Sequence, residues 1–403
     1  MHDLLYLAHR IPYPPNKGDK IRSWNIMRDL AAHYRVHLGC FVDDPTDRVH
    51  QPMLEKICAS CHFASLNPSF ARLRGLVGLL SGAPITLGYY RDAGLARWIA
   101  RVLQSREIRR VFVFSSSMAQ YVLGGAATRT RRIVDFVDVD SDKWRQYAHA
   151  QSWPGSWIYG RESRTLLAFE RRAAAVADAS LFVSEAEADL FRRLAPESAD
   201  RIAALNNGVD LDFFDPKATY PNPFADGSET LVFTGAMDYW ANVDAVAWFA
   251  RDVLPQIRAR RPSAEFCIVG ARPAAQVRAL ATQPGITVTG RVDDVRPYIA
   301  HAALIVAPLR LARGVQNKVL EAMAMSRPVL ATPEALEGIE ATPGEEVLCA
   351  SGEAAFAEAA LDALADPALA EIGGRARQRA EAAYGWSANL AGLKTILERP
   401  AIG

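Results

Sequence analysis

The sequence predicts an α/β protein built from two doubly wound parallel sheets. Apolar runs of strand length alternate with segments of helical periodicity, and this rhythm occurs in both halves of the chain. The chain has 403 residues, half of them hydrophobic, which is more than one core normally organises. Between the halves, residues 206–228 are rich in Pro, Asn and Asp and show no periodicity, as a linker would.

Ten apolar runs are expected to form the strands. In the first half these are residues 4–9, 36–42, 111–116, 132–139 and 179–184. In the second half they are residues 230–235, 265–270, 286–290, 304–308 and 328–332. Ligands of such sheets bind at the carboxyl ends of the strands. The expected domains are therefore 1–205 and 229–384, joined by 206–228.

Composition narrows the classes of function. The formal net charge is +1, so the chain as a whole lacks the strong positive charge that is typical of nucleic-acid-binding proteins. No apolar run reaches membrane-spanning length, and the first residues lack the regions of a signal peptide, so we expect a cytoplasmic protein. Five cysteines fit a reducing compartment. Cys58 and Cys61 form one CxxC beside His62, but no second pair supports a metal, so buried small residues are the favoured interpretation.

The stretch from Pro308 to Thr332 is the most informative part of the sequence. It is expected to form a strand end, a loop, a helix and another strand. Gly314 permits a tight turn, and Arg313 and Lys318 bracket the helix N-terminus. Backbone N–H groups, the helix dipole and two cations make an anion site that suits a diphosphate. Glu321 lies one turn further on the same face, where it can accept hydrogen bonds from ribose hydroxyls. The alternative is an ordinary strand–helix–strand unit with solvated charges.

A second candidate site is the acidic run at 134–144. On an extended strand, Asp138 and Asp140 share one face, and buried neighbouring carboxylates are costly unless they are used or paired. A strand end suits a catalytic base or a clamp for an acceptor hydroxyl, so we predict Asp138 and then Asp140 as catalytic residues. Alternatively, Ser141 or Asp142 caps the next helix and Asp138 pairs with Lys143.

Several motifs occur in a defined order. They are NNGVDLDFFDP at 206–216, FTGAMDYWANVDAVAWF at 233–249, VTGRVDDVRPYIAHAALIVAP at 288–308 and ALEGI at 335–339. With the 308–332 stretch, they resemble the nucleotide-sugar glycosyltransferases of the GT-B fold, specifically glycosyltransferase family 4 (group 1). The runs LAHRIPYPPNKGDKIRSWNIMRDLA at 7–31 and DFVDVDSDKW at 135–144 resemble the sugar transferases found at bacterial exopolysaccharide and PEP-CTERM/exosortase loci.

The resemblance implies a GT-B arrangement, with the donor on the second domain, the acceptor on the first and a cleft between them. It also implies that the last helix, at about 385–403, crosses back onto the first domain; a plain terminal helix of the second domain is the alternative. The loop around Gly18 would face the diphosphate and the acceptor with Arg22 as a donor, or would be only a solvated turn and helix cap. The complete expected donor site consists of Gly18, Arg22, Gly235, Arg291, Val292, Gly314, Val315, Gln316, Asn317, Lys318, Glu321 and Gly338.

Two departures from the family pattern stand out. After Gly235 many members carry an Arg and a Lys that hold the phosphates, but Ala236 and Asn242 occupy the approximate places here. Members also usually carry a Glu eight positions before the residue equivalent to Glu321, and this chain has Arg313 there. Arg313 and Lys318 would therefore have to supply the positive charge at the diphosphate.

We therefore predict a glycosyltransferase that moves a sugar from a nucleotide diphosphate sugar to a saccharide or lipid-linked acceptor in exopolysaccharide biosynthesis. The resemblance implies retention of the anomeric configuration. No metal motif accompanies the donor site, so Arg313, Lys318 and the helix N-terminus are expected to stabilise the leaving diphosphate without a metal or cofactor. The alternatives are a sugar-nucleotide epimerase and an inactive scaffold protein of a polysaccharide assembly system.

One further segment bears on whether the protein contacts the membrane. Residues 70–82, FARLRGLVGLLSG, are basic at one end and strongly apolar at the other. They predict either a peripheral contact with the inner face of the plasma membrane or a helix packed on the first sheet.

Overall fold

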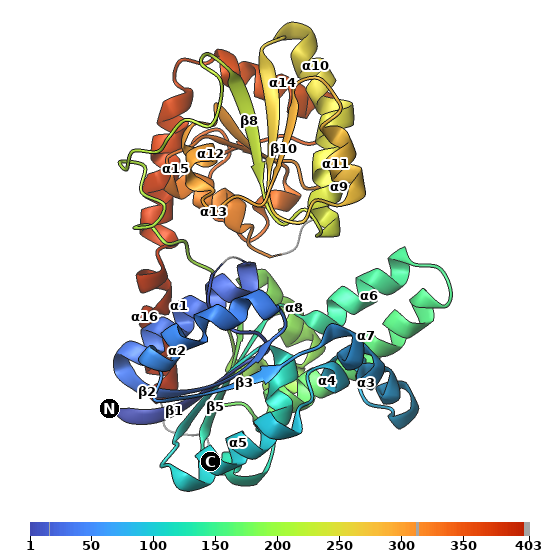
Figure 1. Ribbon diagram of the computed structural model, residues 1–403, viewed down its shortest axis with the longest axis vertical. Coiled ribbons are helices and arrows are strands. Elements are labelled where there is room, and N and C mark those ends of the chain that lie inside the picture. The colour runs from blue at the N-terminus through green and yellow to red at the C-terminus, as the bar shows by residue number, and fades with distance from the viewer. Residues whose placement is uncertain (16, 312–313, 399–403) are drawn as a thin grey trace. The chain divides into compact units, whose positions relative to one another are not determined.

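The computed structural model describes residues 1–15, 17–311 and 314–398, which form two compact units (Figure 1). The first unit comprises Met1–Asn206 and the chain from Leu390 onward, and the second comprises Asn207–Asn389. Each unit contains a parallel sheet with helices on both of its faces. The predicted fold class, two doubly wound parallel-sheet domains, is confirmed.

The first sheet has the strand order β3-β2-β1-β4-β5-β6-β7. Its strands are β1 (His2–Ala8), β2 (Tyr34–Val42), β3 (Ser60–Ser65), β4 (Arg110–Phe114), β5 (Arg131–Val137), β6 (Ala179–Phe182) and β7 (Ile202–Ala204). The central strands are continuous apolar runs because a parallel sheet covered by helices buries both faces of each strand. The order reverses between β1 and β4, so the loops after these strands leave the sheet side by side at its carboxyl edge.

The helices of the first unit connect these strands. They are α1 (Gly18–His33), α2 (Gln51–Ile57), α3 (Pro68–Ser81), α4 (Ile85–Tyr89), α5 (Ala93–Ser105), α6 (Asp140–Ala150), α7 (Gly155–Val176) and α8 (Glu185–Leu194). Side chains fix several of their starts: the Asp92 carboxylate accepts a hydrogen bond from Leu95 N at 2.7 Å, and Ser184 Oγ accepts one from Glu187 N at 3.3 Å. None of the helices in the described part of the chain is long and apolar enough to span a membrane.

The last helix, α16 (Trp386–Glu398), belongs to the first unit from Leu390 onward. Arg110 Nε donates to Leu397 O at 3.1 Å, and Arg131 Nε donates to Ile396 O at 2.8 Å. Cations at a helix C-terminus satisfy its last carbonyl groups and interact favourably with the helix dipole.

The second sheet has the order β10-β9-β8-β11-β12-β13. Its strands are β8 (Glu229–Thr234), β9 (Ala264–Val269), β10 (Ile286–Gly290), β11 (Leu304–Ala307), β12 (Val329–Ala331) and β13 (Leu348–Cys349). The helices are α9 (Trp240–Trp248), α10 (Leu254–Arg260), α11 (Ala275–Leu280), α12 (Arg296–Ala300), α13 (Asn317–Ala324), α14 (Glu353–Ala365) and α15 (Leu369–Ala383). Helices α9 to α11 lie on one side of the sheet, and α12, α13 and α15 lie on the other (Figure 1).

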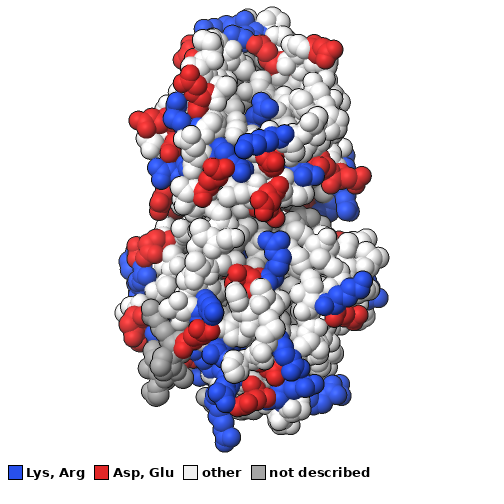
Figure 2. Space-filling model, turned by 90° about the vertical axis from the view of Figure 1, so that its left-hand side faces the viewer, with Lys and Arg blue, Asp and Glu red and all other residues white. Residues whose placement is uncertain are grey.

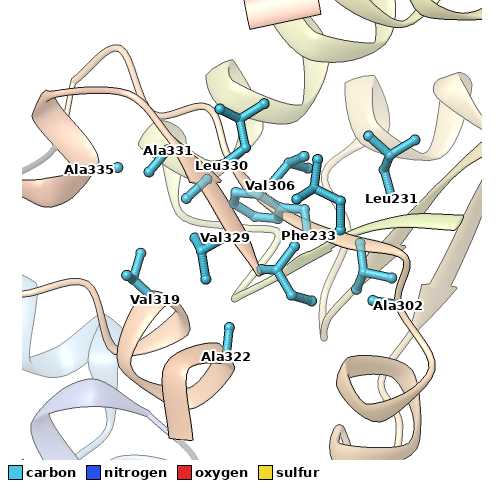
Figure 3. Packing of buried hydrophobic residues seen from close by; sticks show 14 of the residues in the cluster. Leu231, Phe233, Ala302, Val306, Val319, Ala322, Val329, Leu330, Ala331 and Ala335 are labelled. Carbon is cyan, nitrogen blue, oxygen red and sulfur yellow. The ribbon is translucent and has the colours of Figure 1, made fainter. Parts of the chain in front are cut away.

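The core of the second unit fixes the orientation of α13. Val319 and Ala322 point from this helix toward the apolar side chains of the strands, among them Phe233 and Val329 (Figure 3). These four residues are buried. Because Val319 and Ala322 anchor α13 to the sheet, Lys318 in its first turn lies beside the core, with Nζ 5.1 Å from the centroid of the Phe233 ring.

The stretch predicted as a linker, 206–228, packs on the second unit instead. Val209 forms a parallel bridge with Gly385, and Arg377 Nη1 donates to Phe214 O at 2.8 Å. Val209 and Phe214 are buried in the core of that unit. The polar turn residues around them mask these apolar anchors in the sequence pattern, so this part of the predicted domain division is corrected.

Candidate functional site

The topology of the second sheet brings together two segments that the sequence proposed separately. Strands β8 and β11 are neighbours at the point where the strand order reverses, so the loops after them meet at the carboxyl edge. Gly235 follows β8, and α13 follows β11. Lys318 in the first turn of α13 consequently contacts Asn242 in the first turn of α9.

Lys318 is a half-buried cation with neutral partners. Its Nζ donates to Asn242 Oδ1 at 3.3 Å and to Gln316 Oε1 at 3.2 Å, and lies 5.1 Å from the centroid of the Phe233 ring. Within the described ranges this ammonium forms no ion pair. Burial lowers the pKa of Lys318 to about 8, against the opposing charge of Glu321. An ammonium that has lost water without gaining a counter-ion is well prepared to bind an anion.

Asn242 occupies the approximate place of a cation that many members of the resembled family carry after the glycine, and its contacts explain why an amide fits there. Its Nδ2 donates to Ala236 O at 2.9 Å, which turns Oδ1 toward Lys318. Gly235 makes room for this arrangement, because a Cβ there would lie 2.7 Å from Asn242 Nδ2. The carbonyl oxygen of Gly235 is packed even more closely, since a Cβ on Gly270 would lie 1.7 Å from it. The turn after β8 therefore requires glycine for close packing.

Glu321 lies three residues after Lys318 on the same face of α13 and is half-buried. Burial raises the pKa of Glu321 to about 7, and the Lys318 charge opposes that shift. The described residues give its carboxylate no hydrogen-bonding partner. A carboxylate in this position can accept hydrogen bonds from ligand hydroxyls.

The loop before α13 is shaped as an anion site would require. Gly314 has φ +67°, a conformation that favours glycine, and its carbonyl accepts a hydrogen bond from Gln316 Nε2 at 3.0 Å. Val315 is 8% exposed and anchors the loop to the core. Asn317 Oδ1 is buried without a partner among the residues described. Arg313, predicted as the second cation, lies outside the described residues.

The remaining predicted donor residues lie on loops at the same edge. Arg291 is exposed and Val292 half-buried, directly after β10. Gly338 follows β12 with φ +78°. The backbone connects the β10 loop to the loop after β9, because Gly270 N donates to Gly290 O at 3.2 Å. These residues thus share the carboxyl edge of the sheet with Lys318.

In the first unit, Arg22 has an internal role that corrects the expected donor contact. Its side chain is 1% exposed, with Nε 2.8 Å and Nη2 3.1 Å from the two carboxylate oxygens of Asp135. Nη1 donates to Leu205 O at 2.6 Å. A fully buried, bidentate guanidinium is committed to the fold. Gly18, the first residue of α1, is exposed, and the neighbouring Lys20 is buried in an ion pair with Asp47 at 2.8 Å.

Asp138 and Asp140 lie together at the end of β5, and both pair with Lys143. Lys143 Nζ is 2.7 Å from Asp138 Oδ2 and 3.4 Å from Asp140 Oδ1. The structural pairing considered as the alternative for Asp138 is therefore present. Both carboxylates remain partly exposed, at 20% and 32%. Val137 before them has φ +70°, a strained conformation for a β-branched residue that redirects the chain here.

Two buried glutamates behind this strand end were not predicted. Glu187 Oε2 accepts from Val139 N at 2.8 Å, and Glu170 Oε1 accepts from Ser141 N at 3.3 Å. Burial, with the Asp140 charge, raises the pKa of Glu170 to about 8. Both lie on later helices, so only their spacing on otherwise apolar helical faces hinted at burial.

A further polar cluster follows β1, next to the point where the first sheet reverses its order. Asp19 Oδ2 lies 3.2 Å from His9 Nε2 and 2.5 Å from Arg10 Nη1. Burial raises the pKa of Asp19, but the His9 hydrogen bond and the Arg10 charge outweigh it and hold the pKa well below its usual range. Arg10 Nε also binds Asp43 at 2.9 Å. This cluster was not predicted from the sequence, because Asp43 comes from a separate loop after β2.

Comparison with solved structures identifies the fold. The structure matches the Anabaena protein HepE in complex with UDP and glucose, with a TM-score of 0.69, 14% identity and coverage of 99% of this chain and 100% of that one. It matches sucrose-phosphate synthase from Thermosynechococcus elongatus with a TM-score of 0.70, 18% identity and 98% coverage of both chains. The fold is the GT-B fold.

Another solved structure and a family model also match this chain. A glycosyltransferase from Rickettsia africae gives a TM-score of 0.66 with 15% identity and 99% coverage of both chains. Residues 228–366 match the family model described as "Glycosyl transferases group 1". No curated protein matches the sequence. The family match spans the segment that carries Gly235, Lys318 and Glu321.

The lowered pKa of Lys318 leads to a pH prediction. As pH rises through about 8 the ammonium loses its proton, so affinity for a nucleoside diphosphate should fall above that pH. A bound diphosphate favours the charged form, so binding near pH 8 should take up a proton, since phosphate itself is ionised above about 6. Calorimetry in buffers of different ionisation enthalpy measures this uptake. Lys318→Met should abolish it, whereas an unchanged proton count in that variant would contradict the assignment.

Proposed function

We propose that the protein is a glycosyltransferase that takes a sugar from a nucleotide diphosphate sugar. The observation that carries this proposal is the half-buried Lys318 ammonium at the N-terminus of α13, whose hydrogen-bonding partners among the described residues are neutral. The match of residues 228–366 to group 1 glycosyl transferases supports it. So does the structural likeness to HepE, which was solved with UDP-glucose.

The proposed roles follow from charge and position. Lys318 and the N-terminal N–H groups of α13 hold the diphosphate and stabilise the negative charge that develops as it leaves. Glu321 accepts hydrogen bonds from the ribose hydroxyls, one turn along the same face. Arg313 adds a second cation in this proposal. The loops at Arg291 and Gly338 contact the base and the donor through their backbone.

For the acceptor we propose a saccharide or a lipid-linked saccharide bound by the first unit. Asp138 orients the attacking hydroxyl, with Asp140 as its neighbour. Lys143 holds both carboxylates in position through its ion pairs with them. In this proposal the exposed Gly18 loop also contributes backbone groups to the acceptor site.

The finer points of the proposal are retention of the anomeric configuration, a role in bacterial exopolysaccharide biosynthesis and action at the cytoplasmic side of the membrane. The resemblance of 7–31 and 135–144 to transferases of such loci motivates them. NMR of the product reports its anomeric configuration, and an inverted product would reject retention. Deleting the gene should change the cell's exopolysaccharide, and an unchanged polymer would reject that role.

We further expect transfer to need no divalent metal. Lys318 and the helix N-terminus offer positive charge to the diphosphate, which is the task a metal performs elsewhere. Turnover in excess EDTA should therefore stay near the untreated rate. A collapse that Mn²⁺ restores would show that a metal, and not this helix, carries the charge.

Two variants test the donor site together. Lys318→Ala should weaken binding of a nucleoside diphosphate about tenfold or more, because a charge-assisted contact contributes about 1.5–3 kcal/mol, while binding of the bare nucleoside changes little. Glu321→Ala should do the reverse, keeping the preference for diphosphate and losing the preference for ribose over 2′,3′-dideoxyribose. Titration of the four ligand types measures both. Equal losses for nucleoside and diphosphate in Lys318→Ala would sink the proposed donor site.

A further inference from the structure

Several stretches of the first unit contain no acidic residue, and two of them cover helices with exposed apolar side chains. Of the 403 residues of the chain, 45 are Asp or Glu, yet residues 57–91 and 143–161 have none. The first segment includes α3 and α4, and the second includes most of α6 and the start of α7. On the face of the molecule shown in Figure 2, by contrast, Lys and Arg side chains are interspersed with Asp and Glu. Acid-free stretches also occur elsewhere in the chain, at 108–134, 266–292 and 295–320, so charge alone does not single out these helices.

The two acid-free segments form one continuous structure. Arg161 Nη2 on α7 donates to Gly78 O of α3 at 2.8 Å and to Ala83 O at 3.3 Å. The next residue, Glu162, accepts from Ile85 N at 2.7 Å and from Thr86 N at 2.9 Å, which caps α4. Glu162 is 1% exposed, so its charge is used internally and does not reach the surface.

Large apolar side chains on these helices point into solvent. Trp153 is 79% exposed and Trp157 is 56% exposed at the turn between α6 and α7, which projects from the first unit (Figure 1). Phe70 and Leu73 of α3 are 72% and 63% exposed. Isolated exposed apolar residues are common, but a set of two Trp, one Phe and one Leu on adjoining helices is typical of an interaction site.

Packing beneath the projecting turn keeps it in place. The rings of Trp144 and Tyr159 lie 5.2 Å apart, and those of Trp144 and Tyr147 lie 5.9 Å apart. These three half-buried rings join α6 to α7 one to two turns from the tip. The hairpin therefore presents Trp153 and Trp157 on a supported base and not on a loose loop.

The charges on this surface are cationic. Arg72 on α3 and Arg145 on α6 are both exposed, and Arg145 pairs with the buried Asp142 at 2.6 Å. Arg164 is exposed on α7. Indole rings favour the boundary between headgroups and acyl chains, and arginines pair with anionic headgroups. Nucleic acid would call for a denser cationic stripe without protruding Leu and Trp side chains.

We propose that α3, α4 and the α6–α7 tip form a docking surface for an anionic lipid bilayer. Trp153, Trp157, Phe70 and Leu73 enter the interfacial layer, and the arginines contact acidic headgroups. The surface extends the proposed function, on which it rests for its purpose, by holding the acceptor-binding unit at the membrane where a lipid-linked acceptor resides. Its physical basis does not depend on transfer activity.

Flotation of the full chain with vesicles tests the proposal. The wild type should float with vesicles of phosphatidylcholine and phosphatidylglycerol, and at least tenfold less should float with phosphatidylcholine alone. Trp153→Ser/Trp157→Ser and Phe70→Ser/Arg72→Glu should each reduce flotation at least tenfold. The matched control is Val49→Ser, because Val49 is 75% exposed in the same unit but lies outside both segments. Tryptophan quenching by brominated lipid should drop when Trp153 and Trp157 are replaced.

The outcomes separate this surface from the donor site. No flotation with anionic vesicles, or flotation that both double variants retain, would overturn the proposal. So would a concentration-dependent dimer that only the Trp variant dissociates, because the surface would then bind a second copy of the chain. A chain that floats but binds no nucleoside diphosphate keeps the surface and rejects the proposed function. A chain that binds nucleoside diphosphate and does not float rejects the surface alone.

Discussion

Replacing Asp138 by Asn should lower sugar transfer by about 10²-fold or more while donor binding stays intact. Asparagine keeps the shape of the side chain but removes the negative charge that orients an attacking hydroxyl and accepts its hydrogen bond. The structure places the carboxylate at the carboxyl edge of the first sheet, 20% exposed and 2.7 Å from Lys143. Initial rates with a fixed donor, alongside titration of nucleoside diphosphate, measure the two effects separately.

Two companion variants separate catalysis from ion pairing. Asp140→Asn should cost less than Asp138→Asn, because Asp140 lies farther from the shared ammonium, at 3.4 Å. If Asp138 serves only as the partner of Lys143, then Lys143→Met should reproduce the loss seen in Asp138→Asn. Normal transfer by Asp138→Asn would make this strand end structural and move attention to the exposed loop at Gly18.

Removing the Arg22 guanidinium should destabilise the first unit by about 3–5 kcal/mol, because Arg22→Ala leaves Asp135 as a buried charge without its partner. The Asp135 side chain is fully buried, and Arg22 also satisfies the Leu205 carbonyl that follows β7. Urea unfolding followed by circular dichroism should show the loss in the transition of the first unit, with the second unit unchanged.

A double replacement shows whether the ion pair or merely the volume matters. Arg22→Met/Asp135→Leu should recover most of the lost stability, since apolar residues can replace a buried pair. The donor site provides the control, because Lys318 and Glu321 belong to the second unit and nucleoside diphosphate should bind all of these variants equally. A destabilisation of Arg22→Ala below about 1 kcal/mol would show that water reaches Asp135.

Much of the fold could be predicted because the signals are local. The ten predicted runs coincide with strands, since continuous apolar segments of that length are what a sheet covered on both faces requires. Three strands were not predicted. Strand β3 is only partly buried over its first four residues, and β7 and β13 have three and two residues, too few for a periodic signal. The linker prediction failed because Val209 and Phe214 are apolar anchors within a polar stretch.

The candidate site was likewise predictable from the sequence only where its residues lie close together along the chain. A phosphate and ribose site was indicated because one helix fixes the relation of Lys318 to Glu321, and Gly314 comes three residues before that helix. Asn242 lies 76 residues from Lys318, and only the adjacency of β8 and β11 makes them partners. The same holds for the docking surface. The absence of acid in 57–91 and 143–161 is visible in the sequence, but the contact between these segments is not.

The sequence by itself determined the class of fold, the positions of most strands and the helix that carries Lys318 and Glu321, since these depend on periodicity within one element. Only the tertiary structure decided that Arg22 faces inward to Asp135, 113 residues away, and that Asp138 pairs with Lys143. An exposed arginine and a buried one read alike in a sequence. What distinguishes them is the strand order of the sheet, which brings a carboxylate to one cation and leaves the Lys318 ammonium with neutral amides.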